Sequence, residues 1–375
     1  MSDYSRLVPE HVRRLGGYTP GKSLRQAQQE SGVTCIKLAS NETPFGPSPH
    51  ALRAMQDALR ECNFYPDNDA RELRDKLAEH HAVSPEQVVV TAGSTALLGI
   101  IARTLLSSGL NAVTSQRSFI VYPIATKAAG GELIEVGTRD DGFDLDAVAA
   151  AVNDKTRIVF LANPNNPTGT LVMPDDIGRF LEKMPPHVTT ILDEAYYDFA
   201  EFFAGKRGFQ HSRSLEHLRQ GHRVVILRTF SKAHGLAGVR VGYGIGSAEL
   251  MSYFARMRTT FSISMVAQAG ALEALKDKGH TRRALENNAQ QAELILAGLR
   301  DLGYEPVPTW ANFVYCEIGE DAGAFAKRMQ AEGVIIRPLG PWGAPNAIRV
   351  TIGTPDQNQT FLKAFKKTTD KVGAR

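Results

Sequence analysis

The chain alternates short apolar runs with longer stretches in which apolar residues recur every three to four positions. The short runs are rich in β-branched residues and predict strands over residues 88–91, 112–114, 133–136, 158–161, 190–193 and 224–227. The stretches between them have the period of amphipathic helices. Because the strand-like runs are continuously apolar, both faces of their sheet must be covered. The pattern therefore predicts an α/β fold, with a mostly parallel central sheet sandwiched by helices.

The pattern changes after about residue 250. A helical stretch over residues 281–298 is followed by strand-like segments at 312–317, 334–337 and 348–352. The first thirty or so residues are polar and punctuated by Gly and Pro, which predicts an arm that packs on another surface of this chain or of a second subunit. We therefore expect an N-terminal arm (residues 1–33), a large domain (34–255) and a smaller α+β domain (256–375).

Composition narrows the classes of function. The 375 residues carry 43 Lys and Arg against 40 Asp and Glu, without a basic block, so a nucleic-acid partner is not expected. The three cysteines, Cys35, Cys62 and Cys316, lack the spacing of a disulfide framework or a metal site, which predicts a reducing cytoplasm and no bound metal. Without a long apolar run or an apolar N-terminal segment, neither a membrane span nor export is expected.

Polar residues that could bind a ligand follow several of the predicted strands. In open α/β sheets, ligands bind outside the carboxyl ends of the strands. Ser94 and Thr95 begin a helix directly after a strand, where hydroxyl and N–H groups serve either as an ordinary helix cap or as a phosphate cradle. The run 163–169, Asn-Pro-Asn-Asn-Pro-Thr-Gly, is either a tight turn or a rigid mount for an amide that binds a ligand oxygen.

A carboxylate and an amine follow two further strands. Asp193 ends an apolar run, where a buried charge requires a partner; that partner is either a structural cation or a cationic ligand nitrogen. Lys232 follows the strand at 224–227 and is either a surface lysine or a desolvated nucleophile. Because all these groups fall at strand carboxyl ends, they favour one shared ligand site.

Four motifs carry a resemblance that covers nearly the whole chain. They are the run 163–169, Asp-Glu-Ala-Tyr at 193–196, Ser-Lys-Ala-His-Gly-Leu-Ala-Gly-Val-Arg-Val-Gly at 231–242, and Ile-Arg-Val-Thr-Ile-Gly-Thr at 348–354. In this order they resemble the fold-type I pyridoxal-phosphate aminotransferases, and among these the histidinol-phosphate aminotransferase group. The cofactor that the resemblance implies is pyridoxal 5'-phosphate.

The resemblance also implies roles for individual residues around the cofactor. Lys232 would hold it as an internal aldimine and then shuttle a proton, while Asp193 would pair with its pyridinium nitrogen. The remaining contacts would be Asn166 and Tyr196 to the phenolate oxygen, Phe119 stacked on the ring, and Ser94, Thr95, Ser231 and Arg240 on the phosphate. Tyr65 would reach the phosphate in the neighbouring subunit, which implies a homodimer.

By the same resemblance, the substrates are a small amino donor and a 2-oxo acid. Arg337 and Arg349 would hold the substrate anion, and Tyr18, Asn41 and Asn312 would line the substrate side. The expected reaction moves an amino group from L-histidinol phosphate to 2-oxoglutarate by a ping-pong mechanism.

Two departures from the family pattern keep an alternative donor open. Ser94-Thr95 replaces an acidic pair, and Phe119 replaces a tyrosine. Both variants also occur in a branch that uses phenylalanine or tyrosine, so an aromatic amino acid aminotransferase is the alternative. More distant alternatives are a decarboxylase, such as a threonine-phosphate decarboxylase, and a non-catalytic ligand-binding module, which would have no chemical need for Lys232.

Overall fold

The six strands predicted between residues 88 and 227 lie in one seven-stranded sheet of the computed structural model, which describes residues 4–16 and 24–373. In spatial order the sheet contains β2 (Val88–Thr91), β10 (Gly242–Ile245), β9 (Val224–Thr229), β8 (Thr189–Asp193), β7 (Thr156–Ala162), β3 (Asn111–Ser115) and β4 (Glu132–Val136). Only β10 runs antiparallel to its neighbours. The α/β prediction is confirmed, with β10 as the strand that the apolar pattern did not reveal.

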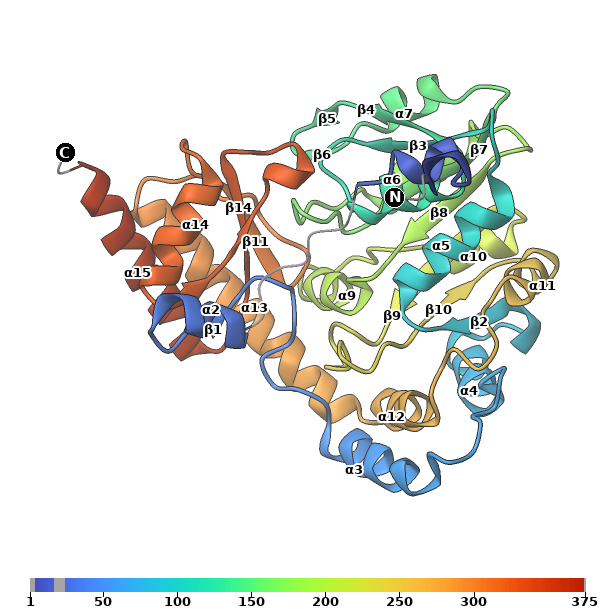
Figure 1. The fold of residues 1–375 in the computed structure, drawn as a ribbon, viewed down its shortest axis with the longest axis horizontal. Helices are drawn as coiled ribbons and strands as arrows, with labels where there is room; N and C mark the ends of the chain where they lie inside the picture. The colour runs from blue at the N-terminus through green and yellow to red at the C-terminus, as the bar shows by residue number, and fades with distance from the viewer. Residues whose placement is uncertain (1–3, 17–23, 374–375) are drawn as a thin grey trace.

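The order of the strands places a ligand crevice near the middle of the sheet. From β3 the chain proceeds to β4 on one side, and from β7 it proceeds through β8 to β9 on the other. Ligands bind at such a reversal, outside the carboxyl ends of the strands. The loops that follow β3, β7, β8 and β9 therefore surround one location (Figure 1).

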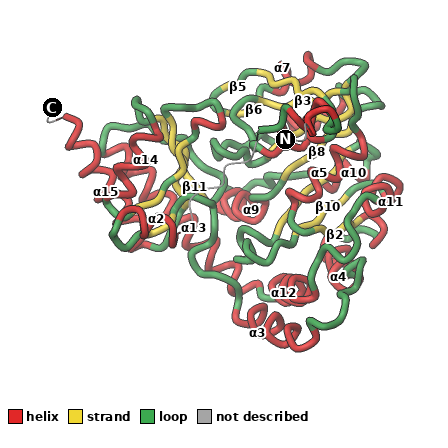
Figure 2. Tube along the Cα trace, in the orientation of Figure 1, coloured by secondary structure: helices red, strands yellow, loops and turns green. Residues whose placement is uncertain are grey.

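Helices enclose this sheet (Figure 2). Their starts follow the expected chemistry, since Ser48, Asp144, Ser247 and Ser264 each accept a hydrogen bond from a backbone N–H of the first turn. The elements are α3 (Pro49–Ala58), η2 (Leu59–Glu61), α4 (Arg71–His81), η3 (Pro85–Gln87), α5 (Ser94–Leu105), α6 (Val121–Ala128), α7 (Leu145–Ala151), α8 (Pro174–Glu182), α9 (Tyr197–Lys206), α10 (Ser214–Arg219), α11 (Ala248–Arg256) and α12 (Met265–Lys276), with a hairpin of β5 (Thr138–Arg139) and β6 (Gly142–Phe143).

A second, smaller body packs beside the carboxyl ends of the sheet (Figure 1). It contains α13 (Lys278–Asp301), β11 (Phe313–Glu317), α14 (Ala322–Ala331), β12 (Val334–Ile335), β13 (Arg337–Pro338), η4 (Gly340–Trp342), β14 (Ala347–Thr351) and α15 (Pro355–Gly373). Its antiparallel sheet has the order β11-β14-β13. A separate apolar core that includes Phe325, Phe361 and Phe365 holds it together.

The N-terminal elements contact both bodies. They are η1 (Tyr4–Arg6), α1 (Glu10–Arg13), α2 (Leu24–Ser31) and β1 (Ile36–Lys37). Helix α1 contacts α6 of the large body, α2 contacts α14 of the small body, and β1 pairs in parallel with β12. None of the helices in the described ranges is long and apolar enough to cross a bilayer.

The packing differs from the predicted domain borders at two places. Leu38 lies in the core of the small body, because β1 adds to β12 there. Ala267 and Ala271 of α12 lie in the core of the large body, because α12 packs along α3. Sequence periodicity does not reveal which of two cores an apolar helix joins. We therefore propose a small domain that takes in residues 34–38 and begins again at α13.

Candidate active site

A cavity of about 220 Å³ lies at the carboxyl ends of β7, β8 and β9, where the small body meets the large one. Most of the residues singled out in the sequence line it. They are Asn41, Ser94, Thr95, Phe119, Asn166, Asp193, Tyr196, Ser231, Lys232, Arg240, Arg337 and Arg349. The structure thus brings together in one pocket side chains that are scattered over more than three hundred positions of sequence.

Asp193 is held rigidly at the end of β8. It is 5% exposed, accepts a hydrogen bond from the Tyr122 hydroxyl at 2.9 Å and accepts another from the Ala195 backbone N–H at 3.2 Å. Burial raises the pKa of this carboxyl to about 6, against the two hydrogen bonds, which lower it. At neutral pH the group is a fixed, mostly ionised carboxylate that faces the cavity.

Lys232 points its amine toward the chain near β1. The Nζ atom donates to the backbone oxygens of Asn41 at 3.1 Å and Ser40 at 3.4 Å. Burial is the main cause that lowers the pKa of Lys232 to about 7, and the nearby guanidinium of Arg349 adds to it. A substantial fraction of the amine is therefore neutral, and nucleophilic, near neutral pH.

An anion-binding corner lies at the start of α5. Ser94 and Thr95 present hydroxyls and the unpaired N–H groups of the first helical turn. The Arg240 guanidinium lies against Gly93 and donates to the Ser231 hydroxyl at 3.3 Å. A Cβ atom on Gly93 would overlap that guanidinium, so glycine is required for the approach. The corner combines a cation, hydroxyls and a helix start, as a phosphate group requires.

Two arginines close the other side of the cavity. Arg337 of β13 and Arg349 of β14 are direct partners in the antiparallel ladder, and both are buried. Arg349 donates to the Asn166 side-chain oxygen and, at 3.0 Å, to the backbone oxygen of Ala39. Trp342 lies near both guanidinium groups. The centroid of its ring is 4.9 Å from the guanidinium carbon of Arg337 and 5.8 Å from that of Arg349. Side by side, two guanidinium groups suit an anionic group that presents several oxygens.

Asn41, Tyr196 and Asn312 form a connected set at the edge of the cavity. Asn41 donates through Nδ2 to the Tyr196 hydroxyl at 2.8 Å, and the Asn312 amide donates to the Asn41 backbone oxygen at 3.1 Å. Asn312 lies behind the cavity wall and not in it, and its own side-chain oxygen is buried without a hydrogen-bond partner. The set supports the wall on which the Lys232 amine rests.

Like Asn312, Tyr65 does not line this pocket. Tyr65 is 81% exposed and stacks on Phe261, with ring centroids 4.6 Å apart. The role of Tyr65 in another subunit stays a prediction. Tyr18 falls outside the described residues.

Two further residues at the site were not predicted as site residues. Tyr122, the hydrogen-bond donor to Asp193, is fully buried in α6 and stacks on Phe160. It follows Phe119 by three positions, and this helical spacing was the only signal in the sequence. Trp342 lines the cavity from η4, in the proline-rich loop between the two arginines.

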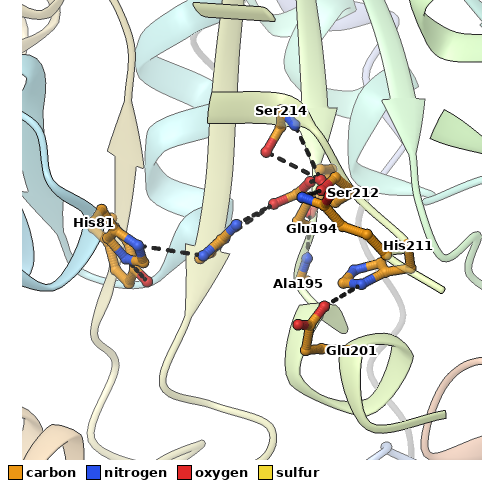
Figure 3. A network of polar contacts seen from close by, with 11 residues as sticks. His81, Glu194, Ala195, Glu201, His211, Ser212 and Ser214 are labelled. Carbon is orange, nitrogen blue, oxygen red and sulfur yellow. Dashed lines mark hydrogen bonds and ion pairs between the residues drawn. The ribbon is translucent and has the colours of Figure 1, made fainter. Parts of the chain in front are cut away.

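Glu194, the residue after Asp193, belongs to a different network of polar contacts (Figure 3). Glu194 accepts hydrogen bonds from Arg228 at 3.0 and 2.8 Å and from the Ser212 hydroxyl. Arg228 lies over the Tyr197 ring, with its central carbon 3.4 Å from the ring centroid, and within 3.5 Å of His81. Here each charge finds its partner inside the protein.

The residues of the cavity fit pyridoxal phosphate. The corner of Ser94, Thr95, Ser231 and Arg240 suits its phosphate, and the Asp193 carboxylate suits a cationic ring nitrogen. Phe119 offers an aromatic face, and Lys232 is an amine of lowered pKa for the aldehyde carbon. The buried carboxylate and the anion-binding corner line a single cavity, as one ligand with a cationic ring and an anionic tail requires.

Comparisons with known proteins agree with this geometry. A family model described as aminotransferase class I and II matches residues 33–365. The chain is 41% identical over 362 residues to a histidinol-phosphate aminotransferase of Nitrosospira multiformis, covering 96% of this chain and 91% of that protein. It is 40% identical over 370 residues to one of Pseudomonas aeruginosa, covering 98% and 99%.

A solved structure is also similar along nearly the whole chain. The histidinol-phosphate aminotransferase of Sinorhizobium meliloti, in complex with pyridoxal 5'-phosphate, matches with a TM-score of 0.88 and 28% sequence identity. The match covers 97% of this chain and 98% of that one.

Proposed function

The chain belongs to the class I and II aminotransferase family, and from this premise we propose that it moves an amino group from L-histidinol phosphate to 2-oxoglutarate. It is a pyridoxal-phosphate-dependent aminotransferase that acts on small molecules. The two substrates use the same pocket in turn, as a ping-pong reaction requires.

The residues of the pocket divide the chemical work. When bound, pyridoxal phosphate supplies a ring that accepts the electron pair released at the substrate carbon. The Lys232 amine, with its pKa lowered to about 7, would take a proton from that substrate carbon and would deliver it to the neighbouring carbon of the cofactor. Asp193, fixed by Tyr122, keeps a positive charge on the ring nitrogen. Asn166 and Tyr196 orient the ring through its oxygen.

The paired arginines are the observation that carries the choice of donor. Arg337 and Arg349 face each other in the ladder, and both line the cavity. A phosphate dianion offers two charges and three oxygens, which match two guanidinium groups better than a single carboxylate does. The arrangement therefore supports a phosphorylated donor.

An aromatic amino acid is the second candidate donor. Trp342 lines the cavity beside the two arginines, so a planar side chain has an aromatic neighbour there. The imidazole of histidinol phosphate would use the same neighbour. Phenylalanine or tyrosine would present its carboxylate to the arginines instead.

The visible absorbance of the cofactor-loaded enzyme tests the proposal. Each donor is added separately without a 2-oxo acid, so that only the first half of the reaction takes place. Loss of the visible band with histidinol phosphate and not with phenylalanine supports the proposed donor. The reverse result replaces it by the aromatic alternative, and release of CO₂ from a phosphorylated amino acid would identify a decarboxylase.

Replacing the ladder arginine tests the shared anion site. Arg349→Ala should weaken binding of both histidinol phosphate and 2-oxoglutarate, by about ten- to a hundredfold, because a charge-assisted hydrogen bond contributes about 1.5–3 kcal/mol. Steady-state kinetics with each substrate varied in turn measure the two effects. A loss confined to one substrate rejects the shared site.

We also propose a homodimer in which Tyr65 completes the partner's phosphate site. Tyr65 and Phe261 are 81% and 45% exposed and stack on each other, Phe64 beside Tyr65 in the sequence is 66% exposed, and none of the three lines the cavity. Exposed aromatic patches of this kind mark interfaces. Analytical ultracentrifugation of the wild type and of Tyr65→Ala, together with cofactor affinity, tests the assembly and the role of the residue.

A cytoplasmic location is the remaining part of the proposal. It is supported by the sequence, in which the three cysteines lack the spacing of a disulfide framework. Fractionation of cells that express the tagged full-length chain would test it.

A further inference from the structure

One arginine joins the two bodies of the molecule beside the active site. Arg117 follows β3, and its Nη1 atom donates to Asp141 of the large body at 3.2 Å. The same atom donates to two residues of β11 in the small body, the Tyr315 hydroxyl at 3.3 Å and the Glu317 carboxylate at 3.2 Å. Tyr315 in turn donates to Glu317 at 3.1 Å.

The backbone of the same residue is attached to the cofactor side of the pocket. The Arg117 carbonyl accepts a hydrogen bond from the Asn165 amide at 2.9 Å, and the Ser118 hydroxyl donates to the Asn165 side-chain oxygen at 3.0 Å. Two neighbours of these residues in the sequence line the cavity. They are Asn166, directly after Asn165, and Phe119, two positions after Arg117. Arg117 thus touches the turn and the loop that face the cofactor.

The side-chain contacts lead to the substrate side. Tyr315 is the direct ladder partner of Arg349, so the strand position that Arg117 contacts is the one beside the anion-binding guanidinium. Arg349 itself donates back to Asn166. The contacts therefore close a circuit from Arg117 through Tyr315 and Arg349 to Asn166, and back through Asn165.

The backbone of Arg117 indicates that this arrangement is imposed by its surroundings. Its φ of +49° lies in the left-handed region, which a residue with a long side chain adopts at a cost. The adjoining Ile120 packs on the apolar cluster that contains Tyr315 and Trp342. Apolar packing and the arginine contacts therefore hold the same junction.

We propose that Arg117 is a positioning residue that fixes the substrate-binding arginine of the small domain relative to the cofactor-facing loops of the large domain. The inference rests on the proposed function, since it assigns to Arg349 the binding of the substrate anion. Arg117 does not line the cavity. Its removal should weaken anion binding and leave the chemical step and the cofactor environment intact.

The test compares Arg117→Asn with the wild type. Asparagine tolerates a positive φ, so the backbone is kept while the contacts to β11 are lost. Binding of succinate, a dicarboxylate that cannot be transaminated, is followed by its effect on the absorbance of the cofactor-loaded enzyme, and KM and kcat are measured for both substrates. We expect a three- to tenfold loss of succinate affinity and an equal rise in both KM values, about the strength of a partly exposed ion-pair network. The value of kcat, the visible band and cofactor affinity should change by less than twofold.

Matched variants separate positioning from general effects of charge. Arg139→Asn removes an exposed arginine of the neighbouring hairpin, whose ion pairs are with Asp144 and Asp146 of the same domain, and should leave succinate binding unchanged. Arg117→Lys retains the charge and should restore part of the affinity. In a double-mutant cycle, Glu317→Gln should add less to Arg117→Asn than it costs alone.

Three results would overturn the inference. Strict additivity of Arg117→Asn and Glu317→Gln would show that the inter-domain contact is not coupled. A fall in cofactor affinity or kcat at unchanged KM would assign Arg117 to loop support alone. Unchanged succinate binding would remove it from the site. If the wild-type enzyme binds succinate but does not transaminate histidinol phosphate, the proposed donor is wrong. The comparison of succinate affinity between Arg117→Asn and the wild type still tests the inference.

Discussion

Two buried carboxylates stand next to each other at the end of β8, and their surroundings differ in a way that separates function from structure. Asp193 and Glu194 are 5% and 4% exposed. Glu194 is neutralised by Arg228 within hydrogen-bond distance, whereas the hydrogen bonds of Asp193 come from neutral donors and burial raises its pKa to about 6. Among the described residues no ion pair neutralises Asp193, so this carboxylate in the cavity wall suits a positive charge from a ligand.

The same contrast applies to the basic groups. Contact with Glu194 raises the pKa of Arg228, which stays charged. Lys232 is in the opposite position, because burial and two neighbouring arginines lower its pKa to about 7. Arg228 and Lys232 lie in the same region at the end of a strand but have different roles. Arg228 holds strands together, and Lys232 provides a reactive amine.

The largest effect should come from removing the amine of the cavity. Lys232→Ala should reduce turnover by more than about a thousandfold, because the nucleophile and the proton carrier are one group. Thermal stability should be unchanged or higher, since a desolvated amine is lost. Single-turnover kinetics and calorimetry measure the two effects, and normal turnover in this variant would remove Lys232 from the mechanism.

Breaking the Glu194–Arg228 ion pair should have the opposite result, with a large loss of stability and little loss of turnover. Glu194→Gln leaves the buried Arg228 without its counter-charge and should lower the free energy of unfolding by about 3–5 kcal/mol. The cofactor-loaded enzyme should keep kcat within a few-fold. Urea unfolding measures the loss, and the double variant Glu194→Gln/Arg228→Met should recover part of it. A larger loss of turnover than of stability would place Glu194 in the catalytic machinery.

The smallest effect is the pH dependence that Asp193 imposes on the cofactor-free protein. Its folded pKa, raised to about 6, lies above the unfolded value of 3.8, so the folded state binds more protons between these limits. This contribution to stability is complete below pH 3.8 and is lost as the pH rises to about 6, by at most about 3 kcal/mol for a shift of about two units. Subtracting the urea-unfolding profile of Asp193→Asn isolates it. Identical profiles would contradict the raised pKa.

The sequence revealed the elements whose physics is local. Strands β2, β3, β7, β8 and β9 are buried along almost their whole length because helices cover both faces of the sheet. Their short runs of β-branched and apolar residues are recognisable in the sequence alone. Strand β10 was missed because Gly242 and Gly244 interrupt its pattern. Both lie where α5 approaches, and a Cβ atom on either one would overlap Ser94 or Leu97.

The site was predictable where a motif places a side chain at a strand end, as for Asp193 and Lys232. Contacts between residues far apart in the sequence were not predictable. Tyr122 reaches Asp193 from a helix seventy-one positions earlier, and the ladder that sets Arg337 opposite Arg349 depends on a strand register that no local pattern reveals. These parts of the site depend on long-range pairing, which the periodicity of the sequence does not reveal.

The attachment of β1 to the small body determines the order in which the site can be assembled. The Asn41 backbone N–H donates to the Thr351 hydroxyl at 2.9 Å across 310 positions of sequence, and the Asn41 carbonyl receives the Lys232 amine. During synthesis, the large sheet can form on the ribosome while residues 36–41 still wait for β12 and β14. A chain that stops short of residue 351 therefore has its sheet and its lysine, but lacks the wall on which that lysine rests. Cofactor colour would be the last property that a newly made molecule acquires.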